Sequence, residues 1–279
     1  MVWIGGHAVP FGKVSLPMYN LPEMRSENRM FWDALRVELS RLGLNDLPDA
    51  LDLQRVPVPA AIDADTLLTQ VCGYPLQTIY RGQAALLAAP VYAAEYCVGA
   101  THCGIFIVNR DSSFERLEDL RGCRFAYNSR HSNSGMNLPR RSIADIAHGK
   151  PFFGAIAETH SHPDNIERVA RGEVDATCVD CVTYAFVARY RRPLAETTRV
   201  LAPTPPSPSI PFVTSVGAGA DLKEALRNAL FRVARADEWS QVRAGLMLQD
   251  IVPIGDASVY EDLLQYEYEA RALGYPELH

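Results

Sequence analysis

The sequence predicts an α/β protein built from two lobes, and three observations carry this prediction. Apolar runs of strand length alternate with amphipathic segments of helical period along most of the 279 residues. Three successive strands in the middle of the chain each end in a polar cluster that enters a helix, as in a parallel sheet. Two stretches, one containing glycines and one rich in proline, are suited to carry the chain between lobes.

Composition limits the kinds of ligand and partner. Hydrophobic residues make up 48% of the chain and charged residues 22%, which is ordinary for a globular protein with a sizeable core. The net charge of −6 argues against a broad nucleic-acid surface, so an anionic ligand would have to be held by local donors. Residues 1–19 lack the basic and then apolar pattern of a leader. We therefore expect a periplasmic protein if a leader has been removed and a cytoplasmic one otherwise.

The first lobe is predicted from its alternating strands and helices. A helix begins at Pro22, carries Phe31, Leu35 and Leu39 on its apolar face and ends at Gly43. The other elements expected here are strands over 13–17, 51–56 and 84–91, a helix over 63–70 and a tight loop over 72–76.

The second lobe is expected to begin after an apolar stretch, 96–108, that contains Gly99 and Gly104. The predicted strands are 123–127, 152–157 and 175–179, and the predicted helices are 113–120, 134–148, 163–171 and 181–190. The stiff proline-rich passage 202–212 then suits a return to the first lobe, with a strand over 212–216 and helices over 221–235, 238–247 and 258–273. We expect lobe 1 to comprise 1–100 and 206–279, lobe 2 to comprise 101–205, and hinges near 99–104 and 203–211.

The polar clusters at three strand ends are expected to share one edge of the sheet, since carboxyl ends of parallel strands face a common crevice. The clusters are Ser132/Asn133/Ser134, His160/Ser161/His162 and Asp180/Thr183.

The stretch from Arg121 to Arg141 shows what such an edge offers chemically. It reads as a strand, a serine-rich turn and a helix, so backbone N–H groups and small hydroxyls meet the positive end of a helix dipole. Gly135 lets a ligand approach the backbone, which favours a small oxyanion. The alternative is that Ser132 or Ser134 merely caps the helix.

The six cysteines are expected to be buried free thiols, because most lie in apolar runs: Cys72, Cys97, Cys103, Cys123, Cys178 and Cys181. Cys178 and Cys181 have CxxC spacing, but no second pair accompanies them. The sequence therefore disfavours a redox or zinc role for this pair and leaves its redox state open. We expect no cofactor and no metal site.

Several stretches together resemble a known family, the phosphate/phosphite/phosphonate class of ABC-transporter substrate-binding proteins. The matching pieces, in order, are LPMY, QVCGYPL, FAYNSRHSNSG, THSH with VARGEVDA, VDCVTYA and TPPSPSIPF. The resemblance implies the two-lobed type II periplasmic-binding fold, with a mixed sheet flanked by helices in each lobe and a ligand cleft between the lobes.

The resemblance also implies site residues. The family's S-x-S-G turn falls on Ser132, Asn133, Ser134 and Gly135, and its ligand-facing histidine falls on His162. His160 replaces a glycine of the family.

Three further positions match the family. Its aspartate before V-T falls on Asp180, which would accept a hydrogen bond from a proton-bearing ligand oxygen and also cap a helix. Tyr19 and Tyr74 match aromatic positions contributed by the first lobe; both also suit core packing.

The favoured function is binding of a small oxyanion, such as phosphate, phosphite or a phosphonate, by hinge closure and without catalysis. The expected partners are the oxyanion and an ABC permease, with no nucleic acid, and we expect a monomer. The alternative is a cytoplasmic enzyme or sensor on the same fold, with menaquinone- or thiamine-precursor-like chemistry and His162 and Asp180 as an acid/base pair.

Overall fold

The computed structural model describes residues 2–4, 7–9, 12–53 and 62–279. The chain forms two compact units: unit 1 is Met1–Ala93 with Ser209–Ala257, and unit 2 is Ala94–Pro208 with Ser258–His279. This division differs from the predicted one chiefly in the C-terminal segment, which was expected in the first lobe. That segment contains α9 (Asp262–Ala272), which packs on α3 (Leu138–Ala147), and Asn137 Nδ2 donates a hydrogen bond to the Leu263 carbonyl at 2.9 Å.

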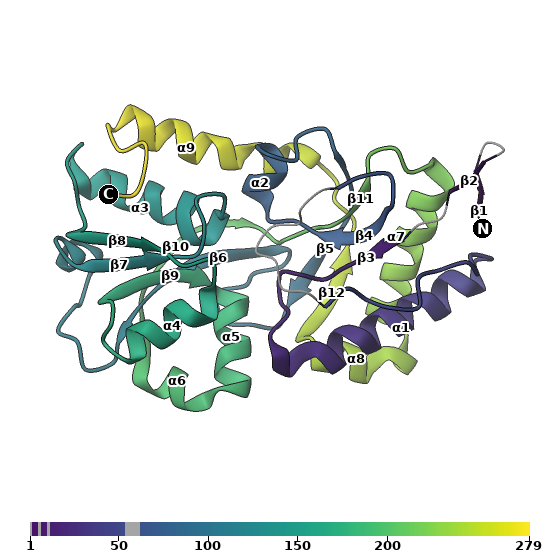
Figure 1. The fold of residues 1–279 in the computed structure, drawn as a ribbon, viewed down its shortest axis with the longest axis horizontal. Helices are drawn as coiled ribbons and strands as arrows, with labels where there is room; N and C mark the ends of the chain where they lie inside the picture. Colours follow the sequence, from purple (N-terminus) through teal and green to yellow (C-terminus); the bar gives the residue numbers. More distant parts are fainter. Residues whose placement is uncertain (1, 5–6, 10–11, 54–61) are drawn as a thin grey trace. The chain divides into compact units, whose positions relative to one another are not determined.

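Unit 1 contains a mixed five-stranded sheet in the order β12-β5-β11-β4-β3. β11 runs antiparallel to β4 and β5, β12 runs antiparallel to β5, and β3 runs parallel to β4. The helix α1 packs on α7 and α8, and α7 packs on β5 and β12 (Figure 1). The strands are β3 (Lys13–Val14), β4 (Thr66–Gln70), β5 (Ala84–Tyr92), β11 (Phe212–Ser215) and β12 (Leu248–Val252); the helices are α1 (Arg25–Arg41), α2 (Gly73–Gln77), α7 (Ala220–Arg235) and α8 (Ser240–Gly245). A separate two-stranded sheet pairs β1 (Val2–Ile4) antiparallel with β2 (His7–Val9).

Three predictions in unit 1 need correction. The helix expected over 63–70 is wrong: β4 occupies Thr66–Gln70, and all five of its residues are buried. A short apolar run is compatible with a helix or a strand, and this one is a strand because it pairs with β11 and β3. The loop expected over 72–76 is the helix α2, because Pro75 lies in its first turn, where a missing N–H costs little. The strand expected over 51–56 lies partly outside the described residues; of the remainder, Asp52 forms an isolated bridge with Ser15.

Unit 2 contains a second mixed sheet, in the order β10-β6-β9-β7-β8. β7 runs parallel to β8 and β9, whereas β6 runs antiparallel to β9 and β10. In Figure 1, α3 and α9 lie over one face of this sheet and α4, α5 and α6 over the other. The strands are β6 (Thr101–Asn109), β7 (Arg124–Tyr127), β8 (Ala155–Glu158), β9 (Ala176–Asp180) and β10 (Thr198–Pro208); the remaining helices are α4 (His162–Ala170), α5 (Cys181–Tyr190) and α6 (Arg192–Thr197).

Both stretches expected to cross between lobes are largely strands of unit 2. The proline-rich passage is part of β10, which pairs with β6 along its length with register shifts at Val200/Ala202 and Pro203/Pro206. Proline is tolerated there because β10 is an edge strand, and an edge residue can lack an N–H without losing a ladder hydrogen bond. The helix expected over 113–120 is reduced to a 3₁₀ turn at Leu117–Leu120.

The described part of the chain contains no helix that is both long and apolar enough to cross a bilayer.

Candidate anion-binding site

Five strand ends of unit 2 meet at one edge of its sheet. The carboxyl ends of β7, β8 and β9 share this edge because the three strands are parallel, which confirms the predicted convergence. β6 runs the other way, with Gly104 opposite Asp180, so its first residues, including His102, lie at the same edge. The end of β10 joins them, since Ser207 is the partner of His102 in the ladder.

The serine-rich turn enters α3 through a π-helical turn, Asn133–Asn137. Ser132 caps it: its Oγ accepts a hydrogen bond from the Gly135 N–H at 3.0 Å, and its carbonyl accepts one from the Asn137 N–H at 3.0 Å. The capping interpretation of Ser132 is therefore correct. It does not compete with anion binding, because the first N–H groups of any helix have no intrahelical acceptor.

Ser134 and His162 come together from two different helix starts. His162 is the first residue of α4, whose N-cap, Ser161, accepts a hydrogen bond from the Asp164 N–H at 3.3 Å. Ser134 Oγ lies 3.4 Å from His162 Nε2. Ser134 is buried and His162 is half-buried. A hydroxyl and an imidazole thus stand side by side where two helix dipoles present their positive ends.

Gly135 is required by the close packing of this turn. A Cβ added there would lie 2.0 Å from Asn128 Oδ1 and 3.0 Å from His162 Cε1. The Asn128 Oδ1 atom is buried and accepts no hydrogen bond from the described residues. An unsatisfied acceptor beside a serine and a histidine marks a polar pocket lining that a proton-bearing ligand oxygen could satisfy.

Asp180 ends β9 and caps α5. Its Oδ1 accepts hydrogen bonds from the Val182 and Thr183 N–H groups at 2.8 and 3.1 Å, and its Oδ2 lies 2.6 Å from His102 Nδ1. Asp180 and His102 are 2% and 1% exposed, so this is a buried pair. Burial acts to raise the pKa of Asp180, but the attraction and hydrogen bond of His102 outweigh it and lower that pKa. Burial acts to lower the pKa of His102, but Asp180 outweighs it and raises that pKa. Both shifts favour the charged pair, a carboxylate beside an imidazolium.

The His102–Asp180 pair continues into a chain of hydrogen bonds that we call the inner chain: Asp180, His102, Ser207, Asn133 and Asn137. Ser207 Oγ lies 3.3 Å from His102 Nε2, accepts from Asn133 Nδ2 at 2.8 Å and donates to the Pro208 carbonyl at 3.2 Å. Asn133 Oδ1 in turn accepts from Asn137 Nδ2 at 3.1 Å. Every residue of the inner chain is at most 2% exposed.

The inner chain changes two sequence-based expectations. The side chain of Asn133 is hydrogen-bonded to Ser207 and Asn137 within the inner chain. Of the ligand contacts predicted for Asn133, only the one through its backbone N–H therefore remains. His102 and Ser207 were missed, because the stretches that hold them were assigned to crossovers. The antiparallel course of β6, which brings His102 beside Asp180, leaves no local signal in the sequence.

Tyr19 and Tyr74 lie in unit 1, so their proposed part in ligand binding stays a prediction. Tyr19 packs edge-on against Tyr92, with ring centroids 5.2 Å apart, and Tyr74 lies in α2. Both are 6% exposed.

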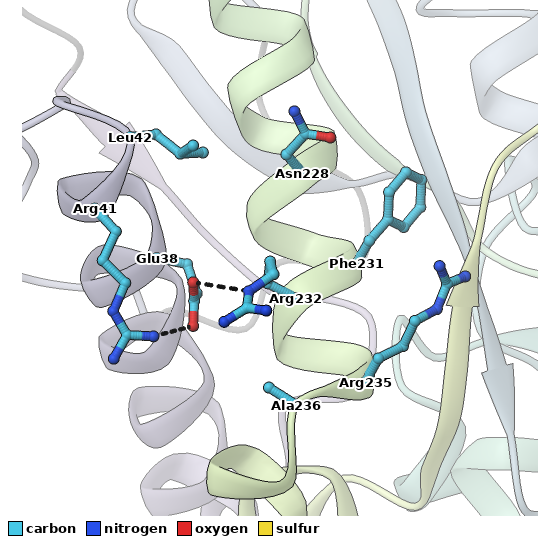
Figure 2. Close-up of a pocket in the computed structure, with 8 residues that line it drawn as sticks. All are labelled: Glu38, Arg41, Leu42, Asn228, Phe231, Arg232, Arg235 and Ala236. Carbon is cyan, nitrogen blue, oxygen red and sulfur yellow. Dashed lines mark hydrogen bonds and ion pairs between the residues drawn. The ribbon is translucent and has the colours of Figure 1, made fainter.

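Unit 1 also contains a groove between α1 and α7, lined by Glu38, Arg41, Leu42, Asn228, Phe231, Arg232, Arg235 and Ala236 (Figure 2). Its arginines are already paired. Arg41 and Arg232 lie 2.7 and 3.5 Å from the carboxylate of Glu38, and Arg235 lies 3.3 Å from Asp250. Glu38 also accepts a hydrogen bond from Trp239 Nε1 at 2.8 Å. The groove is therefore held together as packing between helices and offers no concentrated positive charge.

Within the described ranges, no group of three or more histidine, cysteine, aspartate or glutamate side chains is arranged to hold a metal ion.

The two mixed sheets flanked by helices form the two-lobed α/β fold of type II periplasmic binding proteins. The chain belongs to the family described as the periplasmic substrate-binding protein of phosphonate ABC transporters, whose profile matches residues 75–259, more than half of the sequence. Its class is therefore that of a solute-binding transport component for an oxyanion. No curated protein sequence matches the chain significantly.

Solved structures agree on the fold. The binding-protein component of an ABC phosphonate transporter from Pseudomonas aeruginosa, PA3383, is 18% identical, with a TM-score of 0.73 over 95% of this chain and 87% of that one. PhnD1 from Prochlorococcus marinus, solved with methylphosphonate, is 14% identical, with a TM-score of 0.66 over 94% and 99%. XAC2383 from Xanthomonas citri, solved with a chloride ion, is 15% identical, with a TM-score of 0.69 over 94% and 98%.

Proposed function

We propose that unit 2 binds a phosphonate-type oxyanion at the sheet edge described above, between the starts of the π-helical turn and α4. The observation that carries this proposal is the meeting of Ser134 Oγ and His162 Nε2, 3.4 Å apart, beside the close-packed Gly135. The anion would accept hydrogen bonds from both side chains and from backbone N–H groups of the turn. A protonated His162 would make one of these bonds charge-assisted.

Asp180 is proposed to set the protonation state of the ligand. His102 and the first N–H groups of α5 hold its carboxylate at the sheet edge. A carboxylate there would accept a hydrogen bond from an O–H of a monoprotonated phosphonate or phosphate. It would repel a fully deprotonated anion such as sulfate.

We propose binding without turnover. The acid/base alternative needs Asp180 free to exchange a proton with His162 or a substrate, whereas its carboxylate is held by His102 and by the start of α5. The family supports delivery to an ABC permease in the periplasm, and we propose that the protein works as a monomer. Tyr19 and Tyr74 are proposed to add hydroxyl donors from unit 1.

Calorimetric titration of the full chain with methylphosphonate, phosphate, phosphite and sulfate tests the proposal. We expect at least one protonatable phosphorus oxyanion to bind and to raise the melting temperature, since a ligand that binds only the native state stabilises it. Sulfate should bind much more weakly. If none of the phosphorus oxyanions binds at millimolar concentration, the proposed function is wrong.

A further inference from the structure

Three thiols of unit 2 gather beside the start of α5. Cys181 is the first residue of α5, directly after Asp180, and is 2% exposed. Its Sγ lies 3.7 Å from the Sγ of Cys97, and it is also hydrogen-bonded to the thiol of Cys103. The spacing that suggested a redox motif, Cys178 with Cys181, is therefore the wrong pair to consider. The thiol that Cys181 meets comes from 84 residues earlier in the chain.

The segment that carries Cys97 can be reached from solvent. Cys97 is half-buried in the irregular stretch before β6, where its neighbour Val98 is 78% exposed. Tyr96, with a φ of 68°, adopts the left-handed conformation that non-glycine residues avoid, and Gly99 follows with a φ of 55°. Within this stretch the Cys97 N–H donates to the Ala94 carbonyl at 3.1 Å, and the Thr101 hydroxyl donates to the Val98 carbonyl at 2.8 Å. Small rotations here would bring two sulfur atoms from 3.7 Å to the bond length of about 2 Å.

We propose that Cys97 and Cys181 are a reversible disulfide switch. The oxidant is a disulfide of a small thiol or of a thiol oxidoreductase. The hydrogen bond with Cys181 and burial raise the pKa of the Cys97 thiol, so Cys97 loses its proton to solvent as its sulfur attacks the oxidant, forms a mixed disulfide and releases one thiol. The Cys181 thiolate then attacks the Cys97 sulfur, forms the internal disulfide and expels the second thiol. Two electrons pass from the cysteine pair to the oxidant disulfide, and the two protons lost by the cysteines end on the released thiols.

The two thiols are suited to different steps. Cys97 is the accessible one and can meet the oxidant. Cys181 is enclosed, but a hydrogen bond from the Cys103 thiol, which remains when Cys97 is in a mixed disulfide, lowers the pKa of the Cys181 thiol against the opposing effect of burial. A thiolate beside a mixed disulfide attacks it readily. The second step is therefore intramolecular and favoured by the position of Cys181. The bond would fix the first residues of unit 2 to the helix that Asp180 caps.

The test uses the full chain, first reduced and then incubated in an oxidised/reduced glutathione buffer. Remaining thiols are blocked with N-ethylmaleimide, and the intact mass gives the number of blocked cysteines. Tryptic peptides 82–110 and 172–189 then report the link, but each contains two cysteines. The variants Cys97→Ser and Cys181→Ser, with Cys103→Ser and Cys178→Ser as matched controls, assign it.

The proposal predicts two fewer blocked thiols than in the reduced protein and a link between the two peptides that dithiothreitol removes. The link should vanish in Cys97→Ser and Cys181→Ser and persist in both controls. Fragmentation of the linked wild-type peptides gives the same assignment if a variant fails to fold. Blocking of all six cysteines after oxidation, a stable glutathione adduct on Cys97, or a link that survives in Cys97→Ser would overturn it. None of these readouts depends on ligand binding.

Discussion

The inner chain and the pair formed by Ser134 and His162 occupy the same sheet edge but are built differently. The inner chain is fully buried, and its bonds include one of 2.6 Å between His102 and Asp180. Ser134 and His162 approach each other only to 3.4 Å, near an Asn128 acceptor that is buried without a partner among the described residues. The short, fully buried hydrogen bonds make a rigid support, whereas the longer contact lies where two helix starts meet, and there we propose that the ligand binds. The difference separates a buried support, of which only Asp180 is also proposed to contact the ligand, from Ser134 and His162, which are proposed to bind the ligand.

Substitution of Asp180 should have the largest effect on the inner chain. Asp180→Ala removes the partner of a buried imidazolium and the cap of α5, so we expect the free energy of unfolding to fall by about 3–5 kcal/mol. Urea unfolding measures it. Ser161→Ala is the matched control, because it removes the cap of α4 without an ion pair and should cost about 1 kcal/mol. Equal costs for the two variants would contradict the importance of the His102–Asp180 pair.

Substitution of His162 should weaken phosphonate binding and leave the free energy of unfolding nearly unchanged. His162→Ala is expected to weaken phosphonate affinity about 10- to 100-fold, since a charge-assisted hydrogen bond contributes about 1.5–3 kcal/mol. Its unfolding free energy should change by only about 1 kcal/mol, because the side chain is half-buried. Calorimetric titration and urea unfolding give both numbers. His160→Asn, in the exposed part of the same loop, is the control and should bind normally.

Gly135 lies in the π-helical turn that carries Ser134 as well as Asn133 and Asn137 of the inner chain. Its substitution should therefore reduce both stability and phosphonate binding. Gly135→Ala places a methyl group 2.0 Å from Asn128 Oδ1, which forces the turn to shift. We expect a loss of about 1–3 kcal/mol in stability together with weaker phosphonate binding. Gly255→Ala, where a Cβ meets nothing within 4 Å, is the control. A Gly135→Ala protein that binds and unfolds like the wild type would show that the close packing is unimportant.

The charge state of the inner chain gives a pH dependence. The pKa of Asp180 is lowered from 3.8, so its stabilisation is present above that value and is lost as pH falls through the lower native pKa. The pKa of His102 is raised from 6.5, so its stabilisation is complete below 6.5 and is lost as pH rises through the native pKa. The stability difference between wild type and His102→Asn should therefore be largest between these two ordinary values and shrink toward alkaline pH. A difference that grows there would contradict the ion pair.

His160 should have the smallest effect. It has a φ of 64°, in the left-handed region, at the position where the resembling family has glycine. His160→Gly relieves that conformation but adds freedom to the unfolded chain, so the unfolding free energy should change by less than about 1 kcal/mol. A loss above about 2 kcal/mol would mean that the His160 side chain has a structural contact of its own.

Much of unit 2 follows from local patterns in the sequence. The strand–polar cluster–helix order was enough to place Ser134, His162 and Asp180 at one edge, because parallel strands leave no other arrangement. The pairing of His102 with Asp180 could not be predicted from the sequence, since it depends on an antiparallel strand pairing between residues 78 positions apart. β4 was mistaken for a helix because its five buried residues have no alternation to reveal a strand. The proline-rich passage was expected as an extended crossover and not as the paired edge strand β10, because edge pairing is set by the sheet and not by the strand itself. The chain passes to unit 1 directly after β10, between Pro208 and Ser209.

A crystal structure of the full chain with methylphosphonate tests the central claim most directly. The account predicts phosphonate oxygens within hydrogen-bond distance of Ser134 Oγ and His162 Nε2, while His102 and Asp180 keep their present contact. A phosphonate bound elsewhere in the molecule, or one that leaves both Ser134 and His162 untouched, would contradict it.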